Sequence, residues 1–270
     1  MTLTTLRLSN SGKQVGIRDQ GAGDPLVLIH GVGMQSAAWG PQIAGLSDQF
    51  RVIALDMPGH GASDPLPRAS ALPEFVAWLA EVVNSLGLRE VSVAGHSMGA
   101  LIAGGFAIMH PGLTRRVALV NGVFRRDPEA RAAVEARAIS IQGGEIDRET
   151  PLRRWFGDDG DYKAQQSDVG RWLSEVDPAG YGTAYAAFAK GDDIYADQYG
   201  DIACPFLAIT GDLDPNSTPD MSRDMAASVK NGRAVIVQGH RHMVNLTAEA
   251  CVTTELSAWM NTPSFCEETL

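Results

Sequence analysis

Six runs of Val, Ile, Leu and Ala in this chain are apolar at nearly every position, and longer, more polar stretches separate most of them. A run that is apolar throughout predicts a strand covered on both faces, as in a parallel sheet. Two earlier segments alternate polar and apolar residues, which predicts a hairpin at the edge of that sheet. The predicted hairpin strands are Thr5–Leu8 and Gln14–Ile17, and the covered strands are Leu26–His30, Val52–Asp56, Val91–Gly95, Val117–Asn121, Phe206–Thr210 and Ala234–Gln238.

Several of the stretches between these strands have apolar residues near every 3.6 positions, which is the period of a helix with one buried face. The predicted helices are Leu72–Leu86, Met98–Met109, Pro219–Val229 and Ala248–Met260. Strands that alternate with helices in this way are typical of βαβ winding. The sequence therefore predicts an α/β fold with a mostly parallel central sheet and flanking helices.

One long stretch, Phe124–Gly200, breaks the alternation because it contains no convincing strand. Helical patches at Asp127–Ile141 and Ala184–Lys190 are joined there by loops rich in Gly and Asp. The stretch follows the sixth strand, and an insertion at this point would cover the carboxyl edge of the sheet, where open α/β folds bind ligands. We therefore expect a core domain at residues 1–123 and 201–270 and a helical lid at residues 124–200.

Composition narrows the class of protein. A chain of 270 residues can bury a large core without a disulfide or a metal. Lys and Arg number 22 against 32 Asp and Glu, a net charge of −10, so binding to nucleic acid or to an anionic membrane is not expected. No apolar run approaches the roughly 18 residues of a membrane-spanning helix.

The cysteines indicate the cellular compartment. Cys204, Cys251 and Cys266 are odd in number and lack the spacing of metal ligands, which predicts free thiols in a reducing environment. We therefore expect a cytoplasmic protein without a structural zinc site. The sequence leaves its oligomeric state open.

The segment Gly95-His96-Ser97-Met98-Gly99 lies between a predicted strand and a predicted helix. A serine flanked by glycines in this context predicts a nucleophile at the tip of a sharp, strained turn, because larger side chains at the glycine positions would collide with neighbouring backbone. The competing interpretation is a glycine-rich helix start that a serine caps. The partner motifs favour the nucleophile.

A second turn, His30-Gly31-Val32-Gly33, follows an earlier strand. Its glycines allow the backbone to fold tightly enough to direct an amide at a ligand, so the N–H of Val32 would join that of Met98 in an oxyanion hole. An ordinary turn between strand and helix is the alternative. The third glycine of the dinucleotide-binding motif is absent, which excludes a dinucleotide site of that kind.

Acidic residues and histidines follow the last two strands, at the edge where Ser97 is expected. Asp212 and Asp214 come after one strand, and His240 and His242 come after the other. The chain order of serine, acid and histidine is the one used by α/β-hydrolases. Each position offers two candidates, since an isolated Asp after a strand is usually a turn or helix cap and a lone His is more often structural.

Together these motifs resemble the α/β-hydrolase superfamily, over nearly the whole chain outside residues 124–200, and within it the small bacterial esterases and enol-lactonases. The motifs that carry the resemblance are His30-Gly31-Val32-Gly33, Asp56-Met57-Pro58-Gly59-His60-Gly61-Ala62-Ser63, Gly95-His96-Ser97-Met98-Gly99, Gly211-x-x-Asp214 and His242-Met243-Val244-Asn245-Leu246. The resemblance implies an α/β-hydrolase fold in which Asp214 is the acid and His242 the base. Asn121 occupies the place where some members of the family carry the acid, which removes that alternative.

The resemblance also implies an activity. It indicates a serine hydrolase that cleaves a small-molecule carboxylic ester or lactone, or an amide, through an acyl-enzyme formed on Ser97. This chemistry is expected to need no metal and no cofactor. Two alternatives stay open: a carbon–carbon bond hydrolase of ring-cleavage products, and a slow-hydrolysing ligand receptor on the same fold. His96 and Ala100 replace residues that are usual in the carbon–carbon hydrolases, which disfavours the first alternative.

The residues that select the substrate are expected in the predicted lid, which shows no resemblance to that of a known family. Side chains that would line a pocket, although core packing suits the larger ones as well, are Gly31, Met34, Trp39, Trp155 and Tyr185. Arginines of the lid would bind a substrate carboxylate or form a solvated face, and the second is the favoured interpretation. These arginines are Arg125, Arg126, Arg153 and Arg154.

Overall fold

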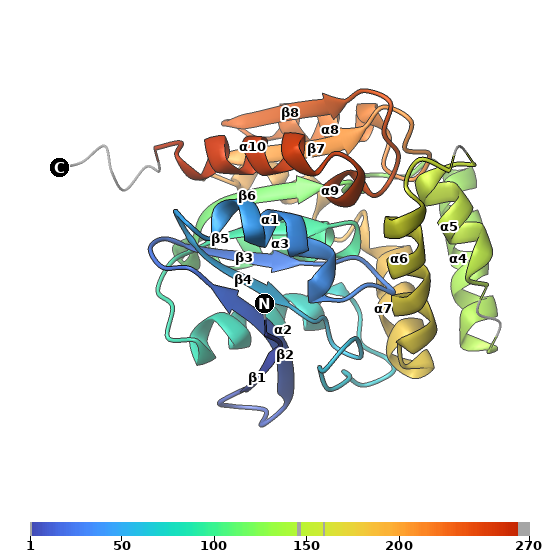
Figure 1. Ribbon diagram of the computed structural model, residues 1–270, viewed down its shortest axis with the longest axis horizontal. Helices are drawn as coiled ribbons and strands as arrows, with labels where there is room; N and C mark the ends of the chain where they lie inside the picture. Colours follow the sequence, from blue (N-terminus) through green and yellow to red (C-terminus); the bar gives the residue numbers. More distant parts are fainter. Residues whose placement is uncertain (1, 145–146, 159, 264–270) are drawn as a thin grey trace.

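The computed structural model describes residues 2–144, 147–158 and 160–263 (Figure 1). Within them, eight strands form one sheet in the order β1-β2-β4-β3-β5-β6-β7-β8. The pairs β1/β2 and β2/β4 are antiparallel and the other pairs are parallel, so the predicted α/β class and mostly parallel sheet are confirmed. The strands are β1 (Thr4–Arg7), β2 (Gln14–Gln20), β3 (Pro25–Ile29), β4 (Arg51–Leu55), β5 (Val91–His96), β6 (Thr114–Val120), β7 (Phe206–Gly211) and β8 (Gly232–Val237).

Helices connect the strands and cover both faces of the sheet. The α-helices are α1 (Gly40–Leu46), α2 (Leu72–Ser85), α3 (Met98–Met109), α4 (Pro128–Gln142), α5 (Glu149–Phe156), α6 (Lys163–Glu175), α7 (Pro178–Gly191), α8 (Pro219–Ser228), α9 (Val244–Thr247) and α10 (Glu249–Met260). Short 3₁₀ helices are η1 (Ser36–Trp39), η2 (Pro111–Leu113) and η3 (Ala196–Asp201). Helices α1 and α10 lie on one face of the sheet, and α2, α3 and α8 lie on the other (Figure 1).

The fully apolar strands are explained by these two layers. In β3, Val27 and Ile29 pack into the core beneath α2 and α3, whereas Leu26 and Leu28 pack into the core beneath α1 and α10. Successive side chains of a strand point to opposite faces, so a strand with two buried faces needs an apolar residue at every position.

The last strand departs from the prediction. The segment Ala234–Gln238 was expected to be covered on both faces, but in β8 the side chains of Ala234, Val235 and Ile236 are partly exposed. The expectation is wrong because β8 is the outermost strand of the sheet and helix α8 packs on it from one side. Helix α1 was not predicted either, and its seven residues are too few to show a helical period clearly.

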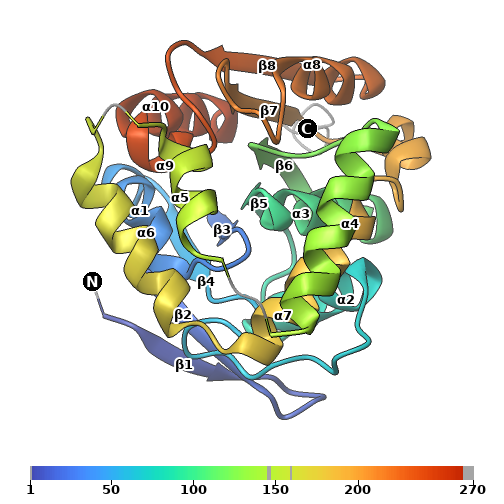
Figure 2. The same ribbon diagram turned by 90° about the vertical axis from the view of Figure 1, so that its right-hand side faces the viewer.

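The segment between β6 and β7 contains α4, α5, α6, α7 and η3, and no strand is found in the part of it that the structure describes. Helix α4 packs on α7, and α5 packs on α6. The four α-helices lie beyond the ends of the parallel strands toward which the arrows point (Figure 2). They therefore stand at the carboxyl edge of the sheet, where the turns after β3, β5, β7 and β8 meet.

The remaining features of the fold concern thiols, membranes and metals. Cys204 and Cys251 are free thiols, as predicted, and Cys266 lies outside the described residues. In the described part of the chain, no helix has both the length and the apolar character needed to cross a membrane. The described residues also contain no group of three or more His, Cys, Asp or Glu side chains placed to hold a metal ion.

Candidate active site

Ser97 lies at the sharp turn between β5 and α3. Its backbone has φ 54° and ψ −112°, in a region that non-glycine residues rarely adopt. The flanking glycines make the turn possible: a Cβ on Gly95 would lie 1.9 Å from the carbonyl oxygen of Gly99, and a Cβ on Gly99 would lie 2.2 Å from the carbonyl oxygen of Ile29. The strand, the helix and the end of β3 therefore meet closely enough to fix the position of Ser97.

His242 and Asp214 come together beside this turn. His242 Nδ1 lies 2.7 Å from Asp214 Oδ2, and both side chains are almost completely buried. Asn121 Nδ2 donates to the same oxygen at 2.8 Å, and the backbone N–H of Asn216 donates to Oδ1 at 2.8 Å. The carboxylate is thus held from two sides, with its oxygen directed at the imidazole.

These contacts keep Asp214 ionised. Burial acts to raise the pKa of its carboxyl group, but the nearby charge of His242 and the hydrogen bonds from His242, Asn216 and Asn121 outweigh burial, so the pKa is lowered. An ionised Asp214 accepts a hydrogen bond from the N–H at Nδ1 of His242. The other ring nitrogen, Nε2, then carries the lone pair that a general base needs.

The competing residues are engaged elsewhere. Asp212 Oδ1 accepts a hydrogen bond from the backbone N–H of Gly239 at 2.7 Å, and His240 Nδ1 lies 2.9 Å from Thr247 Oγ1. Both contacts brace the turns in which these residues lie. Of the two predicted candidates for each position, the structure pairs Asp214 with His242.

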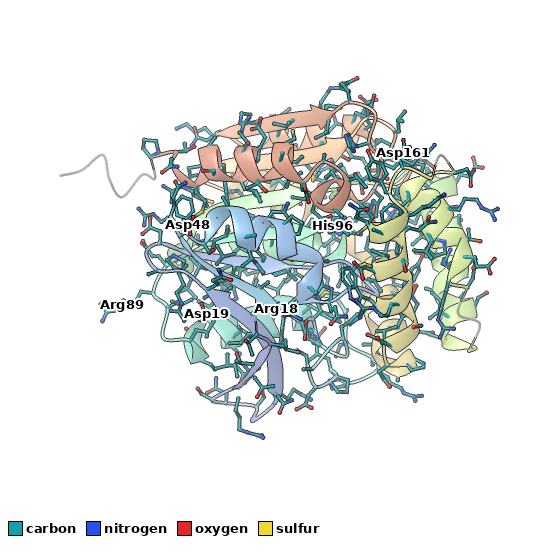
Figure 3. The ribbon with its side chains drawn as sticks, viewed as in Figure 1. Arg18, Asp19, Asp48, Arg89, His96 and Asp161 are labelled. Atoms are coloured by element: carbon teal, nitrogen blue, oxygen red, sulfur yellow. The ribbon has the colours of Figure 1, made fainter. Side chains whose placement is uncertain are left out.

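Two aromatic rings flank the imidazole of His242. Trp155 from α5 stacks on it with ring centroids 5.8 Å apart, and His96 lies 5.0 Å away. His96 Nε2 donates to the carbonyl oxygen of His242 at 2.8 Å, which ties the turn at Ser97 to the loop after β8. His96 lies at the end of the sheet next to α4–α7, whereas Arg89 extends from the opposite end (Figure 3).

The turn after β3 is braced by two buried histidines. His60 Nε2 accepts from the N–H of Gly33 at 3.0 Å, and His30 Nε2 accepts from the N–H of Met57 at 2.8 Å. This arrangement leaves Val32 at the wall of the same pocket as Ser97. Met98 lies in the first turn of α3, where backbone N–H groups have no acceptor within the helix.

A pocket of about 150 Å³ opens on these residues. It is smaller than the several hundred Å³ usual for drug-sized ligands, so it suits a small substrate. Ser97 and His242 line it, together with four of the expected pocket residues, which are Gly31, Met34, Trp155 and Tyr185. The remaining expected residue, Trp39, is fully buried in the core beneath α1 and α10 and is not among the residues that line this pocket.

The arginines divide into two groups. Arg125 and Arg153 are exposed and pair with acids at the surface, in agreement with a solvated face. Arg126 and Arg154 line the pocket together with Arg137, which the sequence had not singled out. For Arg126, whose side chain is 3% exposed, the favoured interpretation of a solvated face is wrong.

The sequence also gave no positive role to Asn121. Its place at the end of β6, next to the end of β7, was the available signal, because the carboxyl ends of neighbouring parallel strands lie side by side. From the sequence, Asn121 only removes an alternative position for the acid. In the structure its amide instead supports Asp214.

Comparison with known proteins agrees with this geometry. Residues 26–254 match the Alpha/beta hydrolase family. The chain is 48% identical over 262 residues, 97% of its length and 99% of the relative's, to a protein of Acinetobacter baylyi named (E)-2-((N-methylformamido)methylene)succinate hydrolase. It is 27% identical to 3-oxoadipate enol-lactonase 1 of the same organism, over 78% of this chain and 79% of the relative.

Solved structures show the same fold. An esterase from Thermogutta terrifontis superposes with a TM-score of 0.86 at 23% identity, covering 96% of this chain and 98% of the other. The enol-lactonase from Burkholderia xenovorans LB400 superposes with a TM-score of 0.83 at 23% identity, covering 95% and 99%. At this level of identity the likeness concerns the fold.

Proposed function

Because this chain belongs to the α/β-hydrolase family, as its motifs predicted, we propose that it is a serine hydrolase that cleaves an ester, lactone or amide bond of a small molecule. The observation that carries the proposal is the hydrogen-bonded pair of His242 and Asp214, which lines one pocket with the strained Ser97. The pocket's small volume supports a small substrate.

In the proposed reaction, His242 Nε2 takes the proton of Ser97 Oγ as this oxygen attacks the substrate carbonyl. The N–H groups of Val32 and Met98 bind the negative charge that develops on the carbonyl oxygen, an interaction typically worth about 3 kcal/mol per donor. His242 then protonates the leaving group and afterwards activates water, which releases the acid from Ser97. Asp214 orients the imidazole and stabilises its protonated form.

The helices at residues 124–200 act in this proposal as a lid on the core formed by residues 1–123 and 201–270. Trp155 of α5 supports this role, because it stacks on His242 and lines the pocket. Tyr185 of α7, in the same segment, also lines the pocket. Residues of this segment that line the pocket would set the specificity.

A second candidate substrate follows from the relative that is 48% identical. Its name describes an unsaturated succinate, with two carboxylates, that carries an N-methylformamido group. That compound contains an amide and no ester, which favours a nitrogen-containing substrate over a simple ester. Carbon–carbon bond hydrolysis by the same residues is the other activity that a substrate panel must test.

Two measurements test the proposal. A sulfonyl fluoride should form a covalent adduct on Ser97, visible by intact-mass spectrometry, and the Ser97→Ala variant should form none. The kcat/KM values for 4-nitrophenyl acetate, a small enol-lactone, the relative's succinate amide and a ring-cleavage product should then identify the bond that is cleaved. An adduct of equal yield on Ser97→Ala would contradict the assignment of Ser97 as the nucleophile. A kcat/KM near zero for all four compounds would favour a ligand receptor.

A further inference from the structure

The pocket is positively charged in a protein of net charge −10. Arg126, Arg137 and Arg154 line it, and no Asp or Glu is found among the described residues of its wall. Such a contrast between a local site and the whole molecule indicates an anionic ligand, because fixed positive charges in a recessed site concentrate anions there.

Arg126 is held rigidly at this wall. Its Nη1 donates to Asp192 Oδ1 at 2.8 Å and lies 3.4 Å from the carbonyl oxygen of Phe188, and its guanidinium lies 4.4 Å from the centroid of the Phe188 ring. The backbone N–H of Arg126 also donates to Asp192 Oδ2 at 2.7 Å. Both charged side chains are nearly inaccessible, at 3% and 0% exposure.

One branch of the guanidinium lacks a partner. Arg126 Nη2 is buried and has no hydrogen-bond acceptor among the residues that the structure describes. Leaving a buried charged donor unpaired is costly, and proteins rarely do so without a reason. Asp192 cannot supply the missing acceptor readily, because its Oδ2 already accepts from the Arg126 backbone and from Arg131 Nη2 at 3.1 Å.

The three arginines also converge on one phenol. Burial raises the pKa of Tyr185, while the charges of Arg137, Arg126 and Arg154 each act to lower it. All three guanidinium groups are therefore close enough to the Tyr185 hydroxyl to influence it. Tyr185 lines the pocket, and its hydroxyl is a further donor for an anion.

We infer that Arg126, braced by Asp192, binds a carboxylate of the substrate through its free Nη2 branch, so that the enzyme selects anionic substrates with at least one carboxylate besides the bond it cleaves. That this anion is a substrate rests on the proposed function, whereas the binding of an anion at Arg126 does not require turnover. A guanidinium held on one side by Asp192, with an unpaired Nη2 on the other, is suited to a carboxylate, because hydrogen bonds between charged groups are the strongest available.

Equilibrium binding to the Ser97→Ala protein tests the site without catalysis. By titration calorimetry, succinate should bind at least about tenfold more tightly than neutral succinamide, and Arg126→Gln should weaken succinate by about tenfold or more. The matched control is Arg125→Gln, which removes the same charge from the neighbouring exposed residue and should change the affinity by less than about twofold. Circular dichroism establishes that each variant is folded.

A milder variant and a kinetic comparison guard against a variant that fails to fold. Arg126→Lys keeps the charge but loses the forked donor, and it should weaken succinate by several fold. In the wild-type protein, 4-nitrophenyl hydrogen succinate should be hydrolysed with a higher kcat/KM than 4-nitrophenyl butyrate. Arg126→Lys should reduce that preference mainly through KM, because the lost contact lies away from the scissile bond.

The outcomes test the carboxylate site and the serine hydrolase activity separately. Equal affinity for succinate and succinamide, or unchanged succinate affinity in both Arg126 variants, would overturn the carboxylate site. Succinate binding that depends on Arg126, in a protein that shows no adduct on Ser97 and no turnover, would retain the site and overturn the proposed serine hydrolase.

Discussion

The Asp214 carboxylate accepts hydrogen bonds on both oxygens, and the three donors come from different parts of the chain. His242 follows β8, Asn121 follows β6 and Asn216 lies in the turn after β7. A buried carboxylate that is held in this way is ionised and cannot rotate freely. The orientation of the His242 imidazole therefore depends on a network, and the two residues should behave as one unit.

Substitutions test this unit. Asp214→Asn and His242→Gln should each lower kcat/KM by several orders of magnitude, and the double variant should lose little more than the worse single variant, because residues of one catalytic unit are strongly non-additive. The matched controls are Asp212→Asn and His240→Gln, whose side chains brace turns; they should keep activity within about tenfold. Activity lost in His240→Gln but kept in His242→Gln would move the base two residues upstream.

The sequence predicted Ser97 but not the burial of Arg126, because the two residues differ in how far along the chain their partners lie. Ser97 is marked by glycines within two residues of it, so a local pattern reveals it. Arg126 and Asp192 are separated by 66 residues, and nothing local in the sequence shows which acid would bury which arginine. Contacts of this kind are fixed by tertiary packing, and so the sequence did not predict the burial of Arg126.

At the scale of elements, the turn at Ser97 depends on three segments that pack at backbone distance. Helix α3 begins directly after Ser97, and its second residue, Gly99, lies against the carbonyl oxygen of Ile29 at the end of β3. The same contact brings the first turn of α3 close to the turn that contains Val32. Small residues are therefore required where the two proposed oxyanion donors meet.

Gly99→Ala should show this requirement. The added Cβ would lie 2.2 Å from a backbone atom, so helix or strand must move, and we expect a loss of about 2 kcal/mol or more in the free energy of unfolding. The matched control is Gly40→Ala at the start of α1, where no atom lies within 4 Å of the added Cβ and φ is −48°. That variant should be neutral or slightly stabilising in urea denaturation. Equal losses in both variants would contradict the packing argument.

Elements were predicted best where the physical cause is local or repeated. The inner strands are apolar at every position because both of their faces are covered, and helix α3 was predicted with its observed bounds. Within residues 124–200 the sequence predicted α4 nearly to its bounds and part of α7 but not α5 or α6; in α5 the polar Arg154 and the apolar Trp155 both line the pocket. A pocket disturbs the alternation of apolar and polar positions from which helices are predicted.

At the scale of the whole molecule, the site is built on a core that contains neutral histidines. Burial lowers the pKa of His60 to about 4 and that of His96 to about 3, and the pKa of His30 is also well below its ordinary value. Each is hydrogen-bonded as a neutral ring that supports a turn at the carboxyl edge of the sheet. The stability of the fold is thereby coupled to pH.

The sign of this coupling follows from where the protons bind. An unfolded chain protonates histidine below about pH 6.5, whereas folded His60 stays neutral until about pH 4, so the unfolded state binds more protons between these values. The stabilisation is therefore complete above about pH 6.5 and is lost as the pH falls toward 4.

His60 alone should reduce the free energy of unfolding by about 2 kcal/mol between about pH 7 and pH 5. His60→Gln can still accept a hydrogen bond from Gly33 but cannot titrate, so urea denaturation should show a weaker pH dependence by that amount, whatever its stability at neutral pH. His110→Gln, at a half-exposed site, should change the dependence much less. An unaltered pH dependence in His60→Gln would show that the His60 ring takes up its proton equally in the folded and unfolded states, and would contradict a pKa lowered by burial.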